Sequence, residues 1–132
     1  MQTIKFSQNW NNKLLLDSYF TTIRIFSNAN HVVGTLVDCE LMRKGEPLNF
    51  VAEIASVTLC LLDRIPEFVF MIDTGYTKEN AIKMFENMYK NKNIDVHQVQ
   101  FCILTLKHRP DLEQRVLEAN QQKALHEAIV DR

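Results

Sequence analysis

The chain has 132 residues, of which 46% are hydrophobic and 23% are charged, and its formal net charge is -1. A chain of this length can bury a sizeable apolar core as one domain, so neither a metal nor a disulfide is needed for folding. The balanced charge excludes a globally basic surface, and any RNA or nucleotide site must therefore be local. No apolar stretch is long enough to cross a bilayer, which predicts a soluble protein without a membrane partner.

The residues that usually hold metals or cofactors are sparse and scattered. Cys39, Cys60 and Cys102 lie far apart in apolar runs, a pattern that predicts reduced core residues in a cytoplasmic protein. The four histidines lack the ligand spacing of a metal site, and three glycines in the whole chain are too few for a Gly-rich phosphate loop. We therefore expect no metal and no cofactor.

The first part of the chain predicts two strands separated by a helix, followed by a third strand. Thr3–Phe6 alternates polar and apolar residues as a strand does, and Ser7 is suited to cap a helix that ends at Ser18 and the aromatic pair after it. Thr21–Phe26 is rich in β-branched and aromatic residues, which favours a strand. The alternation in Thr35–Met42 predicts another strand.

A long strand is expected to return from a hairpin loop. Gly and Pro punctuate Arg43–Pro47, which predicts the loop, and Leu48–Leu62 follows as one extended run. The length of that run and its small residues Ala52, Ala55 and Ser56 indicate a bend or bulge. A bend of this kind lets a sheet curl into a barrel.

Two helices are expected next. Ile65–Ile72 predicts a short helix with Pro66 in its first turn, stopping before Asp73-Thr74-Gly75. Thr77 is expected to cap a stronger helix over Lys78–Lys90. Four of its residues recur at the spacing of one buried face, and this stripe is interpreted as core rather than as a cofactor site: Ala81, Met84, Phe85 and Met88.

The chain is expected to end with a strand and a charged helix. Asp95–Lys107 predicts the strand, and Arg109-Pro110 ends it. Asp111–Arg132 predicts an amphipathic helix that packs against the domain or pairs with a second copy. Because helices and strands do not alternate regularly, the order predicts an α+β fold with a curled, mostly antiparallel sheet.

The strand at Thr21–Arg24 is the best candidate for a working surface. Side chains alternate along a strand, so Thr22 and Arg24 share the face opposite to that of Thr21. A planar guanidinium beside a hydroxyl is suited to hold a phosphate, a carboxylate or a base edge. The alternative is a structural arginine paired with an acidic neighbour such as Asp38 or Glu40.

The segments FSQNWNNKLLLDSYFTTIRI, VGTLVDCELM, VAEIASVTLCLL and IDTGYTKENAIKMFENMY together resemble the ASCH domains of the PUA-like superfamily. The likeness covers roughly Gln2–Lys107, and its specific part is the Thr-Ile-Arg end of one strand, the Val33-Gly34 start of the next, and a helix closed by Tyr89. The resemblance implies a PUA-like β-barrel flanked by helices over residues 1–108, a helical extension over 109–132, and a cleft that binds RNA or nucleotides.

One branch of that family, a small bacterial amidohydrolase that deacylates acetylated cytidine, uses a Lys ahead of the strand, a Thr within it and a Glu before the second helix. By position the Thr corresponds to Thr22, whereas Tyr19 stands at the Lys position and Thr74, beside Asp73, at the Glu position. A phenol is a poor base at neutral pH, so catalysis requires a rescue by Lys13 with Asp73. Recognition is favoured over catalysis.

Three functions remain open at this point. The first is an RNA- or nucleotide-binding domain, whose expected ligand-binding residues are Trp10, Lys13, Tyr19, Thr22, Arg24, Asp73 and Tyr76. The second is an amidohydrolase or nuclease acting on a modified nucleoside or RNA, with Lys13, Thr22 and Asp73 as its catalytic residues. The third is a protein-interaction module that forms a homodimer or another complex through the C-terminal helix.

Overall fold

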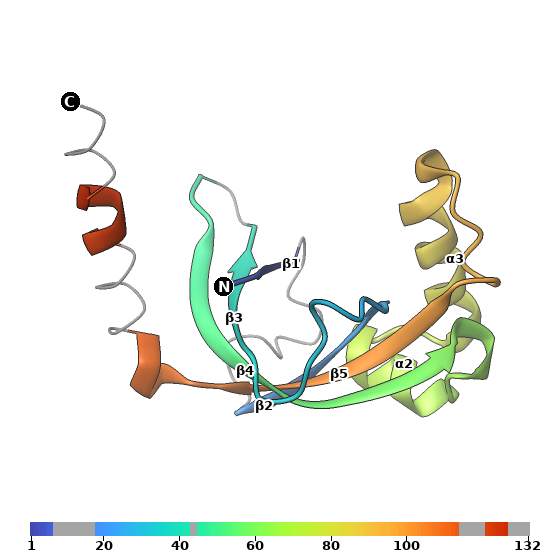
Figure 1. Ribbon diagram of the computed structural model, residues 1–132. Helices are drawn as coiled ribbons and strands as arrows, with labels where there is room; N and C mark the ends of the chain where they lie inside the picture. Colours follow the sequence, from blue (N-terminus) through green and yellow to red (C-terminus); the bar gives the residue numbers. More distant parts are fainter. Residues whose placement is uncertain (7–17, 43–44, 114–120, 127–132) are drawn as a thin grey trace.

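The computed structural model describes residues 1–6, 18–42, 45–113 and 121–126. Five strands form one sheet in the order β1-β3-β4-β5-β2. β1 pairs in parallel with β3, and every other neighbouring pair is antiparallel. The fold is therefore α+β with a curled, mostly antiparallel sheet, as predicted (Figure 1). The strands are β1 (Thr3–Phe6), β2 (Tyr19–Ile25), β3 (Leu36–Leu41), β4 (Leu48–Leu61) and β5 (Gln100–His108).

The curl of the sheet depends on β4. Its first half pairs with β3 and most of its length pairs with β5, and the register to β5 shifts between Ile54 and Ser56. A bulge of this kind bends a strand and increases its local twist. In Figure 1, β4 (green) sweeps from β3 to the helices at the far end of the sheet. The predicted bend at the small residues is thus confirmed.

The curl and the helices enclose two apolar clusters. One is built from all five strands and fills the curl; its largest members include Phe6, Phe20, Phe50, Leu104 and Leu106. The other lies between the helices and the far half of β2 and β5; it includes Ile23, Phe70, Ala81, Phe85 and Phe101. Because side chains alternate along a strand, β2 and β5 each contribute to both clusters.

Two helices and two short 3₁₀ turns connect β4 to β5: η2 (Leu62–Arg64), α2 (Glu67–Thr74), α3 (Lys78–Tyr89) and η3 (Lys90–Lys92). The Thr77 Oγ1 accepts a hydrogen bond from the Asn80 backbone N–H at 3.4 Å, as expected of an N-cap. The predicted end of the Ile65–Ile72 helix was wrong, because the observed helix α2 continues through Asp73 and Thr74. It ends at Gly75, whose φ of 81° is readily adopted only by glycine.

Two strands begin elsewhere than predicted. Tyr19 and the following phenylalanine belong to β2 because they pair with β5, so they do not end a preceding helix. β5 begins at Gln100 rather than at Asp95 and extends to His108. The Asp95 Oδ1 accepts a hydrogen bond from the His97 backbone N–H at 3.0 Å, and this local turn competes with strand pairing.

The predicted helix after Ser7 falls outside the described residues, as does much of the C-terminal helix. Residues 110–113 and 121–126 are helical. In the described parts of the chain, no helix has both the length and the apolar character needed to cross a membrane.

Candidate functional site

β2 presents its two faces to different parts of the molecule. Ile23 packs into the cluster beneath the helices, whereas Phe20 packs into the cluster inside the curl. The Thr21 Oγ1 donates a 2.7 Å hydrogen bond to a carboxylate of α2, while Thr22 is buried on the other face next to Arg24. The predicted alternation along this strand is confirmed.

Arg24 connects the two edge strands of the sheet. Its Nη2 donates a 2.7 Å hydrogen bond to the Lys5 carbonyl of β1, and its Nε donates a 3.1 Å hydrogen bond to the Thr22 Oγ1. The guanidinium carbon also lies 4.7 Å from the centre of the Phe6 ring. Because β1 and β2 are the first and last strands of the sheet, these contacts join its edges. We call this group of Lys5, Phe6, Thr22 and Arg24 the seam.

The positive charge at the seam has no carboxylate at ion-pair distance among the described residues. The expected alternative, a pair with Asp38 or Glu40, is not found there. The Asp38 Oδ2 instead accepts a 3.4 Å hydrogen bond from the Asn49 side chain. Burial lowers the pKa of Arg24, and the neighbouring groups Tyr89, Cys39 and Asp73 only partly oppose that effect. The seam therefore holds a partly desolvated cation.

Two groups close to this cation, His31 and Cys102, have shifted pKa values. The His31 Nδ1 accepts a 3.0 Å hydrogen bond from the Ser27 backbone N–H and lies 3.5 Å from the Cys102 Sγ. Burial, and then the Arg24 charge, lower the pKa of His31. Burial raises the pKa of Cys102 to about 11, so the thiol stays protonated near pH 7. His31 and Cys102 are 71 positions apart in the sequence, so no local sequence pattern predicts their contact.

Asp73 lies on the opposite side of β2. It is 1% exposed, and its Oδ1 accepts the 2.7 Å hydrogen bond from Thr21. Thr74 is also buried, and its Oγ1 donates a 2.7 Å hydrogen bond to the Phe70 carbonyl at the end of α2. Thr22 and Asp73 therefore face different sides of the same strand.

The remaining predicted site residues are dispersed. Tyr19 is 53% exposed at the start of β2, where the Lys107 ammonium lies 5.8 Å from the centre of its ring. Tyr76 is 43% exposed in the turn between α2 and α3. Trp10 and Lys13 lie outside the described residues.

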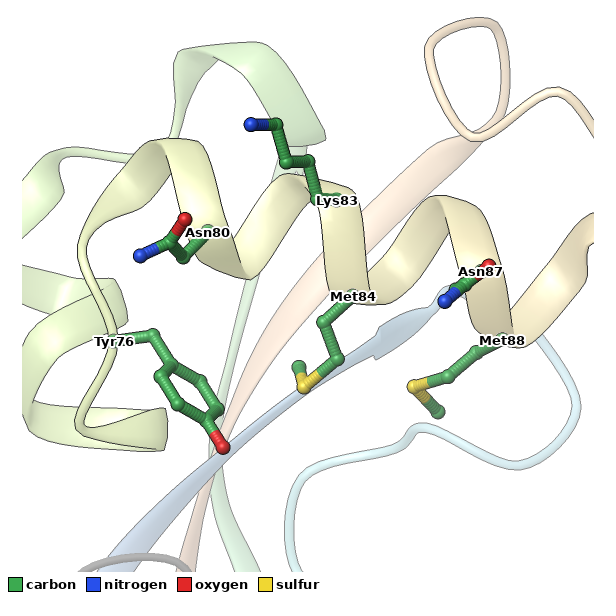
Figure 2. A pocket seen from close by; sticks show the side chains of 6 residues that line it. All are labelled: Tyr76, Asn80, Lys83, Met84, Asn87 and Met88. Carbon is green, nitrogen blue, oxygen red and sulfur yellow. The ribbon is translucent and has the colours of Figure 1, made fainter.

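Tyr76 lines a pocket that sequence reasoning did not find. The pocket has a volume of about 570 Å³ and runs along one side of α3 (Figure 2). We call it the α3 pocket, and the described residues that line it are Tyr76, Asn80, Lys83, Met84, Asn87 and Met88. The interpretation of the α3 stripe as core holds for Ala81 and Phe85, which are buried, but Met88 is 49% exposed. The 3.6-residue spacing places Met88 on the same face as Ala81 and Phe85 but does not reveal that its side chain is half exposed.

His97 forms a small polar cluster beside the helices. Its Nδ1 lies 2.7 Å from the Asp63 Oδ2 of η2, and its Nε2 lies 3.3 Å from the Glu86 Oε2 of α3. Hydrogen bonds to Asp63 and then to Glu86 raise the pKa of His97. These contacts link the turn before β5 to η2 and to α3.

Comparisons of the chain with family models, with curated proteins and with solved structures found no match. Within the described ranges, no three His, Cys, Asp or Glu side chains gather in a way that could hold a metal ion. Inference about function therefore depends on the seam and the α3 pocket.

Proposed function

We propose that this protein binds RNA or a nucleotide and that the Arg24 guanidinium holds a phosphate group. The observation that carries the proposal is the partly desolvated charge of Arg24, which has no carboxylate at ion-pair distance among the described residues. A cation removed from water is costly unless an anion or several acceptors compensate it. A phosphate oxygen supplies that compensation.

The donors of Arg24 are suited to a phosphate. A guanidinium has five N–H groups in a fixed plane. The Nε–H and one Nη2–H bind Thr22 and the Lys5 carbonyl, and the other three N–H groups have no acceptor in the described part of the chain. Contact with Phe6 holds the plane in place before a ligand arrives, which lowers the entropic cost of binding.

The resemblance to ASCH domains points to the same class of ligand. The net charge of -1 means that attraction is confined to this local group, so few phosphates are neutralised. For one or two contacts with single-stranded RNA, the logarithm of affinity falls with the logarithm of salt concentration with a slope of roughly -0.7 to -1.4. A weak salt dependence is therefore part of the proposal.

Titration of a short single-stranded RNA and of nucleoside monophosphates at low and high salt tests the proposal. We expect Arg24→Gln to weaken binding by roughly tenfold or more, because a hydrogen bond to a charged group contributes about 1.5–3 kcal/mol. Arg64→Gln is the matched control, since Arg64 is exposed in η2. Arg24→Lys keeps the charge but not the planar fork, and we expect an intermediate affinity.

Two results contradict the proposal. One is the absence of binding at low salt, where phosphate contacts are strongest. The other is unchanged affinity in a folded Arg24→Gln variant. A hydrolytic role is less well supported than recognition, because Thr22 and Asp73 lie on different sides of β2.

A further inference from the structure

The α3 pocket has the size and the mixed lining of a small-molecule site. Its volume of about 570 Å³ falls within the ~300–1,000 Å³ that is typical of such sites. The lining side chains that the structure describes come from Tyr76 and from α3, so one helix positions most of these contacts. Figure 2 shows them along the helix, with Tyr76 and Met84 projecting to the same side.

Two carboxamides give the pocket its hydrogen-bonding character. Asn80 and Asn87 are seven residues apart, which places them two helical turns apart and on one side of α3, about 10 Å along its axis. Neither side chain hydrogen-bonds to a residue in the described part of the chain. Each amide offers a donor and an acceptor together, the combination that pairs with the edge of a nucleobase.

The rest of the lining is flat or adaptable apolar surface. Tyr76 and Met88 are 43% and 49% exposed, so a large part of their apolar surface is open to a ligand. Nucleobases stack on aromatic side chains, and a thioether can adjust its shape to the face of a ring. An acyl chain would use the apolar surface but would leave both amides without partners, which is unfavourable.

The charge of the pocket suits a nucleotide. Among the described residues that line it there is no carboxylate, and Lys83 is the one charged residue. The Lys83 Nζ lies 3.3 Å from the Glu79 Oε1, but both side chains are largely exposed. Such surface pairs contribute little, so Lys83 can turn to an anionic ligand at small cost.

We infer that the α3 pocket binds a nucleobase, with the Asn80 and Asn87 amides on its edge and Tyr76 against its face. This inference rests on the proposed nucleotide-binding function and assigns the group that recognises the base. The base belongs either to a free nucleotide or to unpaired RNA, which present the same chemistry to the pocket.

Calorimetric titration of the full chain with adenosine and cytidine tests this assignment, because nucleosides carry no phosphate and do not engage the seam. Ribose serves as the probe that lacks a base. We expect nucleosides to bind more tightly than ribose, and the double variant Asn80→Ala, Asn87→Ala to weaken nucleoside binding by roughly tenfold or more. Asn91→Ala is the control, since Asn91 is exposed in η3 and outside the pocket.

The double variant is expected to fold, because alanine favours a helix more than asparagine does. Its thermal midpoint should equal or exceed that of the unsubstituted protein. Nucleoside binding no tighter than that of ribose overturns the inference, and so does unchanged affinity in the folded double variant. Competition by single-stranded RNA but not by its duplex identifies unpaired RNA as the source of the base; competition by mononucleotides alone identifies free nucleotides.

The two proposals fail in different ways. If nucleosides bind through the amides but phosphate binding does not depend on Arg24, the assignment of the seam is wrong and that of the pocket stands. If phosphate binding requires Arg24 but nucleosides do not bind, the pocket assignment alone is wrong.

Discussion

The hydrogen bond from Thr21 to Asp73 is expected to hold α2 against β2, and its removal gives a quantitative test. The substitution Thr21→Val preserves the shape of the side chain and deletes the hydroxyl that donates to the Asp73 Oδ1 at 2.7 Å. Asp73 is 1% exposed, so water cannot easily replace this donor. A buried acceptor that loses a partner costs about 1–3 kcal/mol.

A loss of about 2 kcal/mol lowers the Tm of a chain of this size by roughly 6–10 °C. Differential scanning calorimetry of Thr21→Val measures the shift. Thr105→Val is the matched control, because Thr105 pairs with Thr21 across the sheet and its hydroxyl makes no hydrogen bond within the described residues. A double-mutant cycle with Asp73→Asn should give a coupling energy of about 1 kcal/mol or more. Equal Tm values for Thr21→Val and Thr105→Val would refute this reasoning.

Three further predictions concern pH, backbone conformation and thiol reactivity. Hydrogen bonds that His97 donates to the Asp63 and Glu86 carboxylates raise its pKa above 6.5. The stabilisation of the fold by His97 is therefore complete below pH 6.5 and is lost as pH rises through the folded pKa. His97→Gln should therefore lower the free energy of unfolding, measured in urea, at about pH 5.5 and lower it far less at about pH 9. An equal loss at both pH values would contradict a stabilising role for the protonated imidazole. Gly75→Ala should cost about 1–2 kcal/mol in the same assay, because Gly75 has a φ of 81°, and an unchanged midpoint would contradict this. Timed alkylation with mass spectrometry should label Cys60, which is half-buried, before the buried Cys39 and Cys102, and the reverse order would contradict the burial described above.

Features that depend on local sequence were predicted well. The alternation of Thr21 and Thr22, the bend near Ala55 and the cap at Thr77 each follow from residues within a few positions. Period-two alternation, small residues at a bulge and a hydroxyl before a helix are short-range signals. Errors were confined mainly to boundaries, as at Asp95, where a side-chain turn replaces the expected start of β5.

Features that depend on the closure of the fold were not predicted. The Lys5 carbonyl lies 19 residues before Arg24, and it meets the guanidinium only because the sheet curls until its edge strands approach each other. Asp73 lies 52 residues after Thr21, so its place on the other side of β2 from Thr22 follows from the packing of α2. Likewise, the periodicity of α3 does not reveal that the Met88 side chain is half exposed.

The Nε–H signal of Arg24 in a ¹H–¹⁵N NMR spectrum gives the most direct test of the central claim. This proton donates to the Thr22 Oγ1, and the same guanidinium is proposed to bind phosphate. Titration with a nucleoside monophosphate at low salt should shift this signal in a saturable way and leave that of the exposed Arg64 unchanged. If the Arg24 signal does not move while the ligand is bound, or if only exposed arginines respond, the seam is not the phosphate-binding site.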